Sequence, residues 1–339
     1  MSKRPSDGAR PTMEAVAKLA GVSKITVSRA LRDSDLVRPE LREHIREVAR
    51  QAGYRLNLAA RSLRTRRTQM IAIVVEKLIA SDRPVADPLV LMLIGGLLEE
   101  LSPAGYALLL TTSDRVLESD AIGADGVIMI GEGEDGLRAR QVADLGLPMV
   151  VWGAPLANAP FCVVGSDNRE GGRLAARHLV EGGRSKILFV GDTRHPEVAA
   201  RHEGVRDILS ASPAALVATI ACEFSRSGGA ESVTQALEDG LAFDAIIATS
   251  DYIAAGACGV LMDRGLNVPG DIAVIGFDDN AVAANHRPPL SSIRQDWTAA
   301  GRLLSRTLLE ALADPEATLE NRILPVDLIV RETTGPAKG

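Results

Sequence analysis

From residue 70 to about residue 290 the chain alternates short apolar runs with longer amphipathic stretches, and this alternation constrains the fold most. The apolar runs are continuous, which is typical of parallel strands buried on both faces. The sequence predicts strands at residues 70–75, 107–110, 126–130, 149–152, 186–190, 245–249 and 272–276. It predicts helices between them at residues 88–101, 137–145, 169–181, 199–210, 228–238 and 251–264. A repeated strand–helix pattern predicts a doubly wound α/β body with parallel sheets.

The body is long enough to divide into two lobes, because domains of about 100–130 residues are more common than one open sheet of this size. We expect the chain to leave the first lobe near residues 162–166 and to return near 291–295. The first lobe then comprises residues 70–164 with about 294–322. The second comprises residues 165–293 with about 323–331.

The first 69 residues differ from the body in both charge and pattern. They contain 16 Lys and Arg against 7 Asp and Glu, a net charge of +9, whereas the other 270 residues carry −15. The sequence predicts that residues 1–56 form a small all-α helix-turn-helix domain. Thr12 and Ser23 are the expected N-caps of its first two helices, and a third helix is expected from Pro39 to about Gly53. Residues 57–69 are expected to form a short hinge helix and a basic linker. On the turn pattern alone an ordinary helical hairpin fits equally well, but the basic charge favours binding to nucleic acid.

The cysteines and the apolar segments predict a cytoplasmic protein without a membrane partner. Cys162, Cys222 and Cys258 are far apart and form no CxxC pair, so we expect reduced thiols. The first thirty residues lack an apolar run of signal-peptide length. The longest apolar run, residues 88–98, is too short to span a bilayer.

Short segments in a fixed order carry a family resemblance. In the head they are residues 12–17, 21–23, 26–29, 53–54, 57 and 60–63, and in the body residues 166–168, 201–204, 249–251, 276–279, 288–290 and 295–296. Together they resemble the LacI/GalR (lactose/galactose repressor) family of bacterial transcriptional regulators. The resemblance implies a helix-turn-helix head, a two-lobed body similar to periplasmic sugar-binding proteins, and a homodimer on near-palindromic operator DNA. It implies a small, sugar-like effector and neither a cofactor, a metal nor a catalytic residue.

The resemblance also assigns DNA-binding roles. Lys24, Ile25 and Arg29 would face base edges, and Arg29 suits the O6 and N7 atoms of guanine. Leu63, with Ala60 beside it, would wedge between base pairs from the minor groove and bend the DNA. The residues expected to hold phosphates and register are Thr12, Ser23, Thr26, Ser28, Tyr54 and Asn57.

Effector candidates follow the predicted strands of the body, where ligands of two-lobed α/β proteins bind. They are Arg201, Ser250, Asp251, Asp278 and Trp297, with weaker indications for Asp87 and Trp152. Asp and Arg side chains beside an indole suit a polyhydroxylated sugar ring. Helix capping and salt bridges are the structural alternative for these polar residues.

Three departures from the family pattern bear on these roles. Leu56 stands where the family usually has Pro, so the entry to the hinge helix is less rigid. The segment between Thr112 and Gly126 is short, which predicts a stunted second helix in the body. Gly153 begins a Gly-Ala-Pro segment where many sugar-binding relatives carry Asp, so one sugar anchor is missing.

Two other functions compete with a DNA-binding repressor. Residues 131–136 match GxGxxG, the pattern of an NAD-dependent dehydrogenase, but their three acids would repel a pyrophosphate, and we expect a solvated loop. The five histidines are scattered without metal-ligand spacing, and the sequence shows no catalytic motif. A sugar-binding module without DNA regulation would not explain the basic head. We therefore predict a transcriptional repressor, not an enzyme, controlled by a small metabolite.

Overall fold

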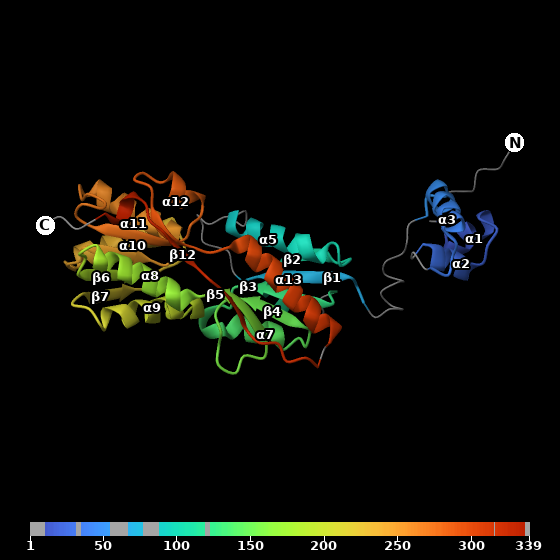
Figure 1. Ribbon diagram of the computed structural model, residues 1–339, viewed down its shortest axis with the longest axis horizontal. Helices are drawn as coiled ribbons and strands as arrows, with labels where there is room; N and C mark the ends of the chain where they lie inside the picture. The colour runs from blue at the N-terminus through green and yellow to red at the C-terminus, as the bar shows by residue number, and fades with distance from the viewer. Residues whose placement is uncertain are drawn as a thin grey trace. The chain divides into compact units, whose positions relative to one another are not determined.

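The chain forms two compact units, Met1–Thr68 and Gln69–Gly339 (Figure 1). The structure is a computed structural model that describes residues 11–31, 35–54, 67–76, 88–118, 123–314 and 316–335. The expectations for Leu56, Asn57, Ala60, Leu63 and Asp87 lie outside the described residues.

The described part of the first unit contains the helices α1 (Met13–Leu19), α2 (Lys24–Ala30) and α3 (Pro39–Gln51). Thr12 caps α1 by accepting a hydrogen bond from the Ala15 amide, and Ser23 caps α2 by accepting one from the Thr26 amide. The buried core of this unit consists of Val16, Ala17, Val27, Ala30, Val37, Ile45 and Ala49. The predicted helix-turn-helix and both predicted caps are confirmed.

The first sheet of the second unit has the strand order β11-β5-β4-β3-β1-β2, and every pairing is parallel. Its strands are β1 (Met70–Val75), β2 (Ala107–Thr112), β3 (Gly126–Ile130), β4 (Met149–Trp152), β5 (Cys162–Ser166) and β11 (Arg322–Leu324). One face packs on α5 (Pro88–Leu101) and α13 (Trp297–Ala313), the other on α6 (Ser113–Leu117) and α7 (Leu137–Ala143). The five-residue α6 confirms the expected stunted helix, and a short 3-10 turn, η1 (Glu134–Gly136), precedes α7.

The second sheet has the order β12-β10-β9-β8-β6-β7. Its strands are β6 (Lys186–Val190), β7 (Ala215–Ile220), β8 (Ala245–Ala248), β9 (Ala273–Asp278), β10 (Ser291–Arg294) and β12 (Asp327–Ile329). All pairings are parallel except the antiparallel pair β10–β12. α8 (Asn168–Glu181) and α9 (Pro196–Leu209) cover one face; α10 (Arg226–Glu238) and α11 (Asp251–Asp263) cover the other, with α12 (Ala281–Asn285) and the 3-10 turn η2 (Glu332–Thr334) beside the sheet.

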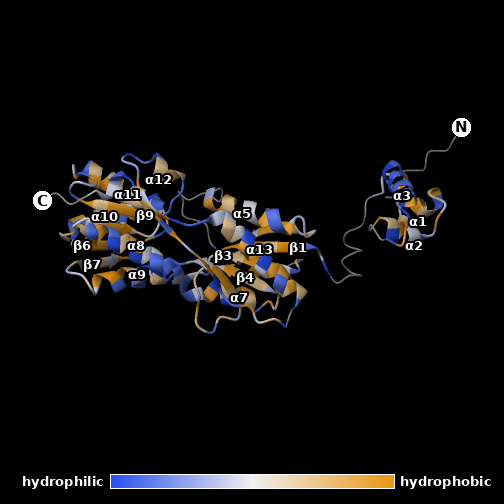
Figure 2. Cartoon of the chain, in the orientation of Figure 1, coloured by the Kyte–Doolittle hydropathy of each residue, from blue (hydrophilic) through white to orange (hydrophobic). Residues whose placement is uncertain are grey.

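Helices therefore cover both faces of both sheets, and the predicted doubly wound α/β architecture is confirmed. In Figure 2 the strands are largely orange, whereas the helices alternate between orange and blue, as expected for strands buried on both faces and helices buried on one.

Three short segments connect the two sheets: β5 to α8, β10 to α13, and β11 to β12. The first two lie next to the expected crossings, although residues 162–166 and 291–294 are strands rather than the linkers themselves. The third crossing lies further along than expected, because Arg322–Leu324 pairs with β5 and so belongs to the first sheet. α13 is absent from the predicted elements; its buried face mixes Gly301 and Ser305 with leucines, which blurs the apolar period.

The helices α8 and α9 approach closely through a pair of glycines. A Cβ atom at Gly172 would lie 2.0 Å from the Arg201 carbonyl oxygen, and one at Gly204 would lie 1.9 Å from the Arg169 carbonyl oxygen. Only glycine permits this backbone-to-backbone packing. The contact fixes the helix that carries Arg201 against the start of α8.

Candidate functional site

The second unit contains a cavity of about 490 Å³ at the carboxyl ends of strands from both sheets. Its walls come from the ends of β1, β3, β4, β6, β7 and β9 and from the beginnings of α8, α9 and α13. This is the place where open α/β sheets bind ligands, and the volume lies in the range of small-molecule sites. Of the sequence-predicted effector residues, the cavity brings together Arg201, Asp278, Trp152 and Trp297.

Arg201 is only 6% exposed, and several contacts fix its orientation. Its Nε donates to Asn168 Oδ1 at 2.8 Å, and Nη1 donates to the Thr249 carbonyl at 2.5 Å. The guanidinium carbon lies 3.6 Å from the centroid of the Phe277 ring, a cation–π contact. A buried guanidinium held in this way is preorganised to donate to ligand oxygens.

Asp278 ends β9 with a backbone φ of 102°, a conformation that non-glycine residues rarely adopt. Its Oδ1 accepts a 2.6 Å hydrogen bond from Nε2 of Gln295, which lies in the crossing between β10 and α13. Strained backbone of this kind is typical of functional sites. The contact links a cavity carboxylate to one of the segments that connect the two sheets.

An aromatic pair closes one wall of the cavity. The rings of Trp152 and Trp297 have centroids 5.3 Å apart and are tilted by 53°. Trp297 is 7% exposed, and among the described residues its indole Nε1 has no hydrogen-bond partner. Because a buried Trp N–H is normally paired, this donor is available to a ligand in the cavity.

An ion-pair chain spans the cavity wall from one sheet to the other. Arg194, which follows β6, contacts Asp192 at 2.5 Å and Glu134 of η1 at 2.8 Å. The Arg194 guanidinium holds the pKa of the Asp192 carboxyl below its usual range. The Arg194 carbonyl also accepts from the Asp135 amide at 2.7 Å. These contacts join the loop after β3 to the loop after β6.

The glycine-rich loop after β3 is solvated only in part: Glu134 and Asp135 are exposed as expected, whereas Glu132 is buried. Glu132 is 1% exposed, because positive φ angles at Gly131 and Gly133 fold the loop so that its side chain lies in the cavity wall. Its Oε2 accepts a 2.8 Å hydrogen bond from the Ala154 amide, whereas its Oε1 has no partner among the described residues. Burial raises the pKa of Glu132 to about 8, so the carboxyl is largely neutral at pH 7.

The first unit presents one face of α2 to solvent. Val27 and Ala30 are buried, whereas Lys24, Ile25 and Arg29 are exposed; Ile25 is 64% exposed. Lys24 pairs with Glu14 of α1. An exposed isoleucine beside an arginine on the second helix matches the position that contacts base edges in helix-turn-helix proteins.

Comparison with known proteins identifies the family. Residues 12–57 match the model for bacterial regulatory proteins of the lacI family, and residues 176–334 match the periplasmic binding protein-like domain. The HTH-type transcriptional regulator CelR of Thermobifida fusca is 32% identical over 96% of this chain and 98% of its own length. The chain belongs to the lacI family of bacterial regulatory proteins. It is accordingly a DNA-binding transcriptional regulator.

Other relatives agree with this membership. The ribose operon repressor of Haemophilus influenzae is 27% identical over 95% of this chain and 98% of its own length. The structure of a CelR–cellobiose complex covers 96% of this chain and all of its own, with 30% identity and a TM-score of 0.73. A lac repressor dimer bound to operator has a TM-score of 0.84 at 24% identity over 96% of this chain and all of its own, which shows the shared fold.

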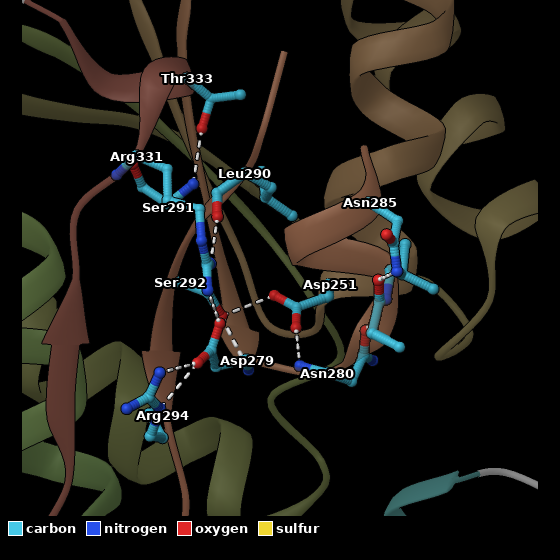
Figure 3. Close-up of polar contacts among 12 residues, drawn as sticks. Asp251, Asp279, Asn280, Asn285, Leu290, Ser291, Ser292, Arg294, Arg331 and Thr333 are labelled. Atoms are coloured by element: carbon cyan, nitrogen blue, oxygen red, sulfur yellow. Dashed lines mark hydrogen bonds and ion pairs between the residues drawn. The ribbon is translucent and has the colours of Figure 1, made fainter. Parts of the chain in front are cut away.

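Two of the expected effector residues of this LacI-family chain do not line the cavity. Ser250 caps α11 by accepting from the Ile253 amide at 3.2 Å. Asp251 is fully buried: its Oδ1 accepts from the Ser292 hydroxyl at 2.6 Å, and its Oδ2 accepts from the Asn280 amide at 2.8 Å (Figure 3). In this structure both residues therefore make the capping and hydrogen-bonding contacts of the structural alternative, and neither lines the cavity. The Asp279 carboxylate, next to Asp278, forms ion pairs with Arg294 and Arg331.

Several residues that line the cavity were not among the effector residues predicted from the sequence: Glu76, Glu132, Asn168, Asp192, Arg194, Glu197 and Gln295. Each lies just after a strand or at the start of a helix, as the predicted ligand residues do. Position alone could have selected Glu76 and Asp192, which follow β1 and β6. The burial of Glu132 depends on the fold of its loop, whereas the acidic sequence of that loop favours exposure to solvent.

No helix within the described ranges has the length and apolarity needed to cross a membrane.

Proposed function

We propose that this chain is a repressor whose affinity for operator DNA is switched by a small sugar-like effector bound in the cavity. The observation that carries the proposal is the pairing, in one chain, of a helix-turn-helix unit with a cavity lined by Arg201, Asp278 and two indoles. Charged groups that exchange hydrogen bonds with hydroxyls, next to flat apolar rings, suit a sugar. The cellobiose complex of the relative CelR supports the same ligand class.

We assign DNA readout to the exposed face of α2. Lys24, Ile25 and Arg29 are proposed to contact bases, and Thr12, Ser23, Thr26, Ser28 and Tyr54 to position the phosphate backbone. The exposure of Ile25, an apolar side chain that the core of its own unit does not use, supports the base-contact role. Asn57, Ala60 and Leu63 keep their proposed roles from the family resemblance alone.

We propose a homodimer on a near-palindromic operator. On the first sheet, the edge strand β2 exposes Leu109 and Leu110, and α5 exposes Leu91, Met92 and Leu98. Exposed apolar side chains on neighbouring elements are typical of protein interfaces, and symmetric pairing of one such patch gives a two-fold dimer.

The lobe limits are proposed as residues 69–166 and 295–324 for the first lobe and residues 167–294 and 325–335 for the second.

The experiment that tests the proposal is selection of genomic DNA fragments by the purified full chain, followed by gel shifts on the selected and on random sequences. A sequence preference that a sugar weakens or strengthens supports the proposal. Equal affinity for all sequences, together with sugar binding, would instead favour a sugar-binding module without DNA regulation. Calorimetric titration with NAD tests the dehydrogenase alternative, and saturable binding would favour it.

A further inference from the structure

The cavity lining is strongly acidic. Among the described residues that line it, seven are acids and two are arginines, with His195 in addition. The acids are Glu76, Glu132, Glu134, Asp192, Glu197, Glu223 and Asp278. A ligand that carries a carboxylate or a phosphate would bring negative charge next to these acids in a partly desolvated site. The lining therefore disfavours sugar acids and sugar phosphates.

The two arginines are already engaged within the protein. Arg194 pairs with Asp192 and Glu134. Arg201 donates to Asn168 and Thr249 and lies over the ring of Phe277. These contacts leave Glu76, Glu132 and Glu197 without an arginine partner among the hydrogen bonds and ion pairs of the described residues. The lining therefore holds more carboxyl groups than arginines, and a cationic ligand group would be attracted to it.

Two of these carboxyl groups have an oxygen that is buried and without a hydrogen-bond partner in the described part of the chain: Glu132 Oε1 and Glu197 Oε2. Glu132 is the decisive one, because the whole residue is 1% exposed and lines the cavity. Buried polar atoms in native proteins are nearly always paired, so such an atom in a cavity wall is a site for a hydrogen bond with a ligand or an ordered water. The Nε1 donor of Trp297, unpaired in the same cavity, indicates a ligand acceptor as well.

A metal ion does not satisfy this arrangement. Over the described ranges, no group of three or more His, Cys, Asp or Glu side chains is placed to hold a metal. An organic ammonium group, by contrast, has three N–H donors that can reach carboxyl oxygens from several directions. The faces of Trp152 and Trp297 attract a cation and also cover the C–H face of a sugar ring.

We propose that the effector is an amino sugar whose ammonium group donates a hydrogen bond to Glu132 Oε1, with the sugar ring against the Trp152–Trp297 pair. This proposal rests on the proposed sugar-responsive function and narrows its ligand class. A neutral sugar offers hydroxyl groups but does not compensate the acidic charge, and a linear diamine offers charge without a ring for the indoles.

The proposal predicts proton release on binding. Burial and the nearby Glu197 raise the pKa of Glu132, the Ala154 amide and Arg140 lower it, and the result is about 8, so the group is mostly protonated in the free protein at pH 7. An adjacent ammonium lowers the pKa of a carboxyl. Binding of the amino sugar should therefore displace close to one proton from Glu132 into the solvent. A neutral sugar should displace none.

The experiment titrates the full chain at pH 7 with glucosamine, galactosamine, mannosamine and the β-1,4-linked glucosamine disaccharide. Glucose, cellobiose, N-acetylglucosamine and putrescine serve as comparison ligands. Fluorescence reports binding, because Trp152 and Trp297 are the only two tryptophans in the sequence and both line the cavity. Calorimetry in buffers of different ionisation enthalpy gives the number of protons released.

We expect at least one amino sugar to bind about ten-fold or more tightly than its N-acetyl or hydroxyl counterpart, with proton release, since one charge-assisted hydrogen bond provides that discrimination. In Glu132→Gln, which keeps the shape and the acceptor for the Ala154 amide, the preference and the proton release should both disappear. The exposed Glu231→Gln on α10 removes the same charge away from the cavity and should retain both.

A neutral sugar or putrescine that binds as tightly as the best amino sugar would overturn the proposal, as would the absence of binding by every amino sugar tested. A preference for amino sugars that is unchanged in Glu132→Gln would also overturn it. Operator binding is measured on the same samples. If operator binding is sequence-specific and responds to a neutral sugar, the amino-sugar proposal is refuted and the proposed repressor function stands. If the wild-type chain shows no sequence-specific operator binding, the proposed function itself is refuted.

Discussion

Replacing Glu132 by glutamine should change how the stability of the body depends on pH. The carboxyl of Glu132 is buried, and the burial together with the nearby Glu197 raises its pKa from 4.5 to about 8. Unfolding returns the group to water, where its pKa is ordinary. Between these two pKa values the folded protein therefore holds a proton on Glu132 that the unfolded protein has lost.

The sign and the size follow from this difference. Because the folded state binds more protons between pH 4.5 and about pH 8, the free energy of unfolding falls as the pH rises through that window and levels off above it. One pKa unit corresponds to about 1.36 kcal/mol, so the full shift of Glu132 corresponds to about 5 kcal/mol between the two limits. A relaxation that lets water reach the carboxylate reduces this value, and we expect an observed loss of roughly 2–5 kcal/mol.

Glu132→Gln removes the titration and keeps an oxygen to accept from the Ala154 amide. At pH 5, where both side chains are neutral in the folded protein and little of the loss has developed, the two proteins should have similar stability. At pH 9 the variant should be the more stable by the amount given above. Urea unfolding followed by tryptophan fluorescence measures this directly, since both tryptophans lie in the 69–339 unit.

The exposed Glu231→Gln variant is the matched control, and its stability should follow the wild-type curve across the same pH range. Parallel curves for wild type and Glu132→Gln from pH 5 to pH 9 would refute the reasoning, because they would mean that the folded protein does not raise the pKa of Glu132.

Three further predictions concern DNA binding, effector binding and packing. Arg29→Ala should cost about 1–3 kcal/mol of operator affinity and relax specificity at one symmetric base position, as selection on randomised operators would show; an equal loss on all sequences would make Arg29 a phosphate contact. Arg201→Ala and Asp278→Ala should each cost on the order of 2–4 kcal/mol of effector affinity while operator binding without effector stays intact; a mutant with the wild-type response removes that residue from the site. Gly204→Ala should destabilise the body by about 1–3 kcal/mol in urea unfolding, because the new Cβ would lie 1.9 Å from the Arg169 carbonyl oxygen. Gly259→Ala, whose Cβ would have nothing within 4 Å, should not destabilise it. Equal unfolding midpoints for the two variants would contradict the close contact between α8 and α9.

The architecture was predictable because buried parallel strands are short, continuous apolar runs. β1, β3, β4 and β6 have the predicted bounds. β7 (Ala215–Ile220), an edge strand that is nowhere fully buried, was not among the predicted strands, although its sequence is apolar except for Thr219. The three-residue strands β11 and β12 are too short to carry a pattern and are defined by the partners they pair with.

The site was only partly predictable, because two kinds of polar residue follow strands. Asp278 and Asp251 both come after apolar runs, yet the first lines the cavity and the second is hydrogen-bonded to Ser292 and Asn280. What separates them is the arrangement of the loops around α11, which no local pattern encodes. Glu132 shows the reverse case: its acidic, glycine-rich segment has the composition of a solvated loop, and its burial follows from contacts with Gly153 and Ala154, some twenty residues later.

The cavity residues are tied to the segments that connect the two sheets. Arg201 bonds to Asn168, directly after the first crossing, and Asp278 bonds to Gln295, within the second. A ligand that forms hydrogen bonds with Arg201 or Asp278 changes the strength of that residue's hydrogen bond to a crossing segment, either weakening it by competition or strengthening it by holding the side chain in place. Hydrogen bonds to charged groups contribute about 1.5–3 kcal/mol, and allosteric coupling between sites is typically about 1–3 kcal/mol. We therefore propose that one such bond gained or lost at each crossing shifts the balance between two lobe arrangements of different operator affinity, without any change in the fold of either sheet.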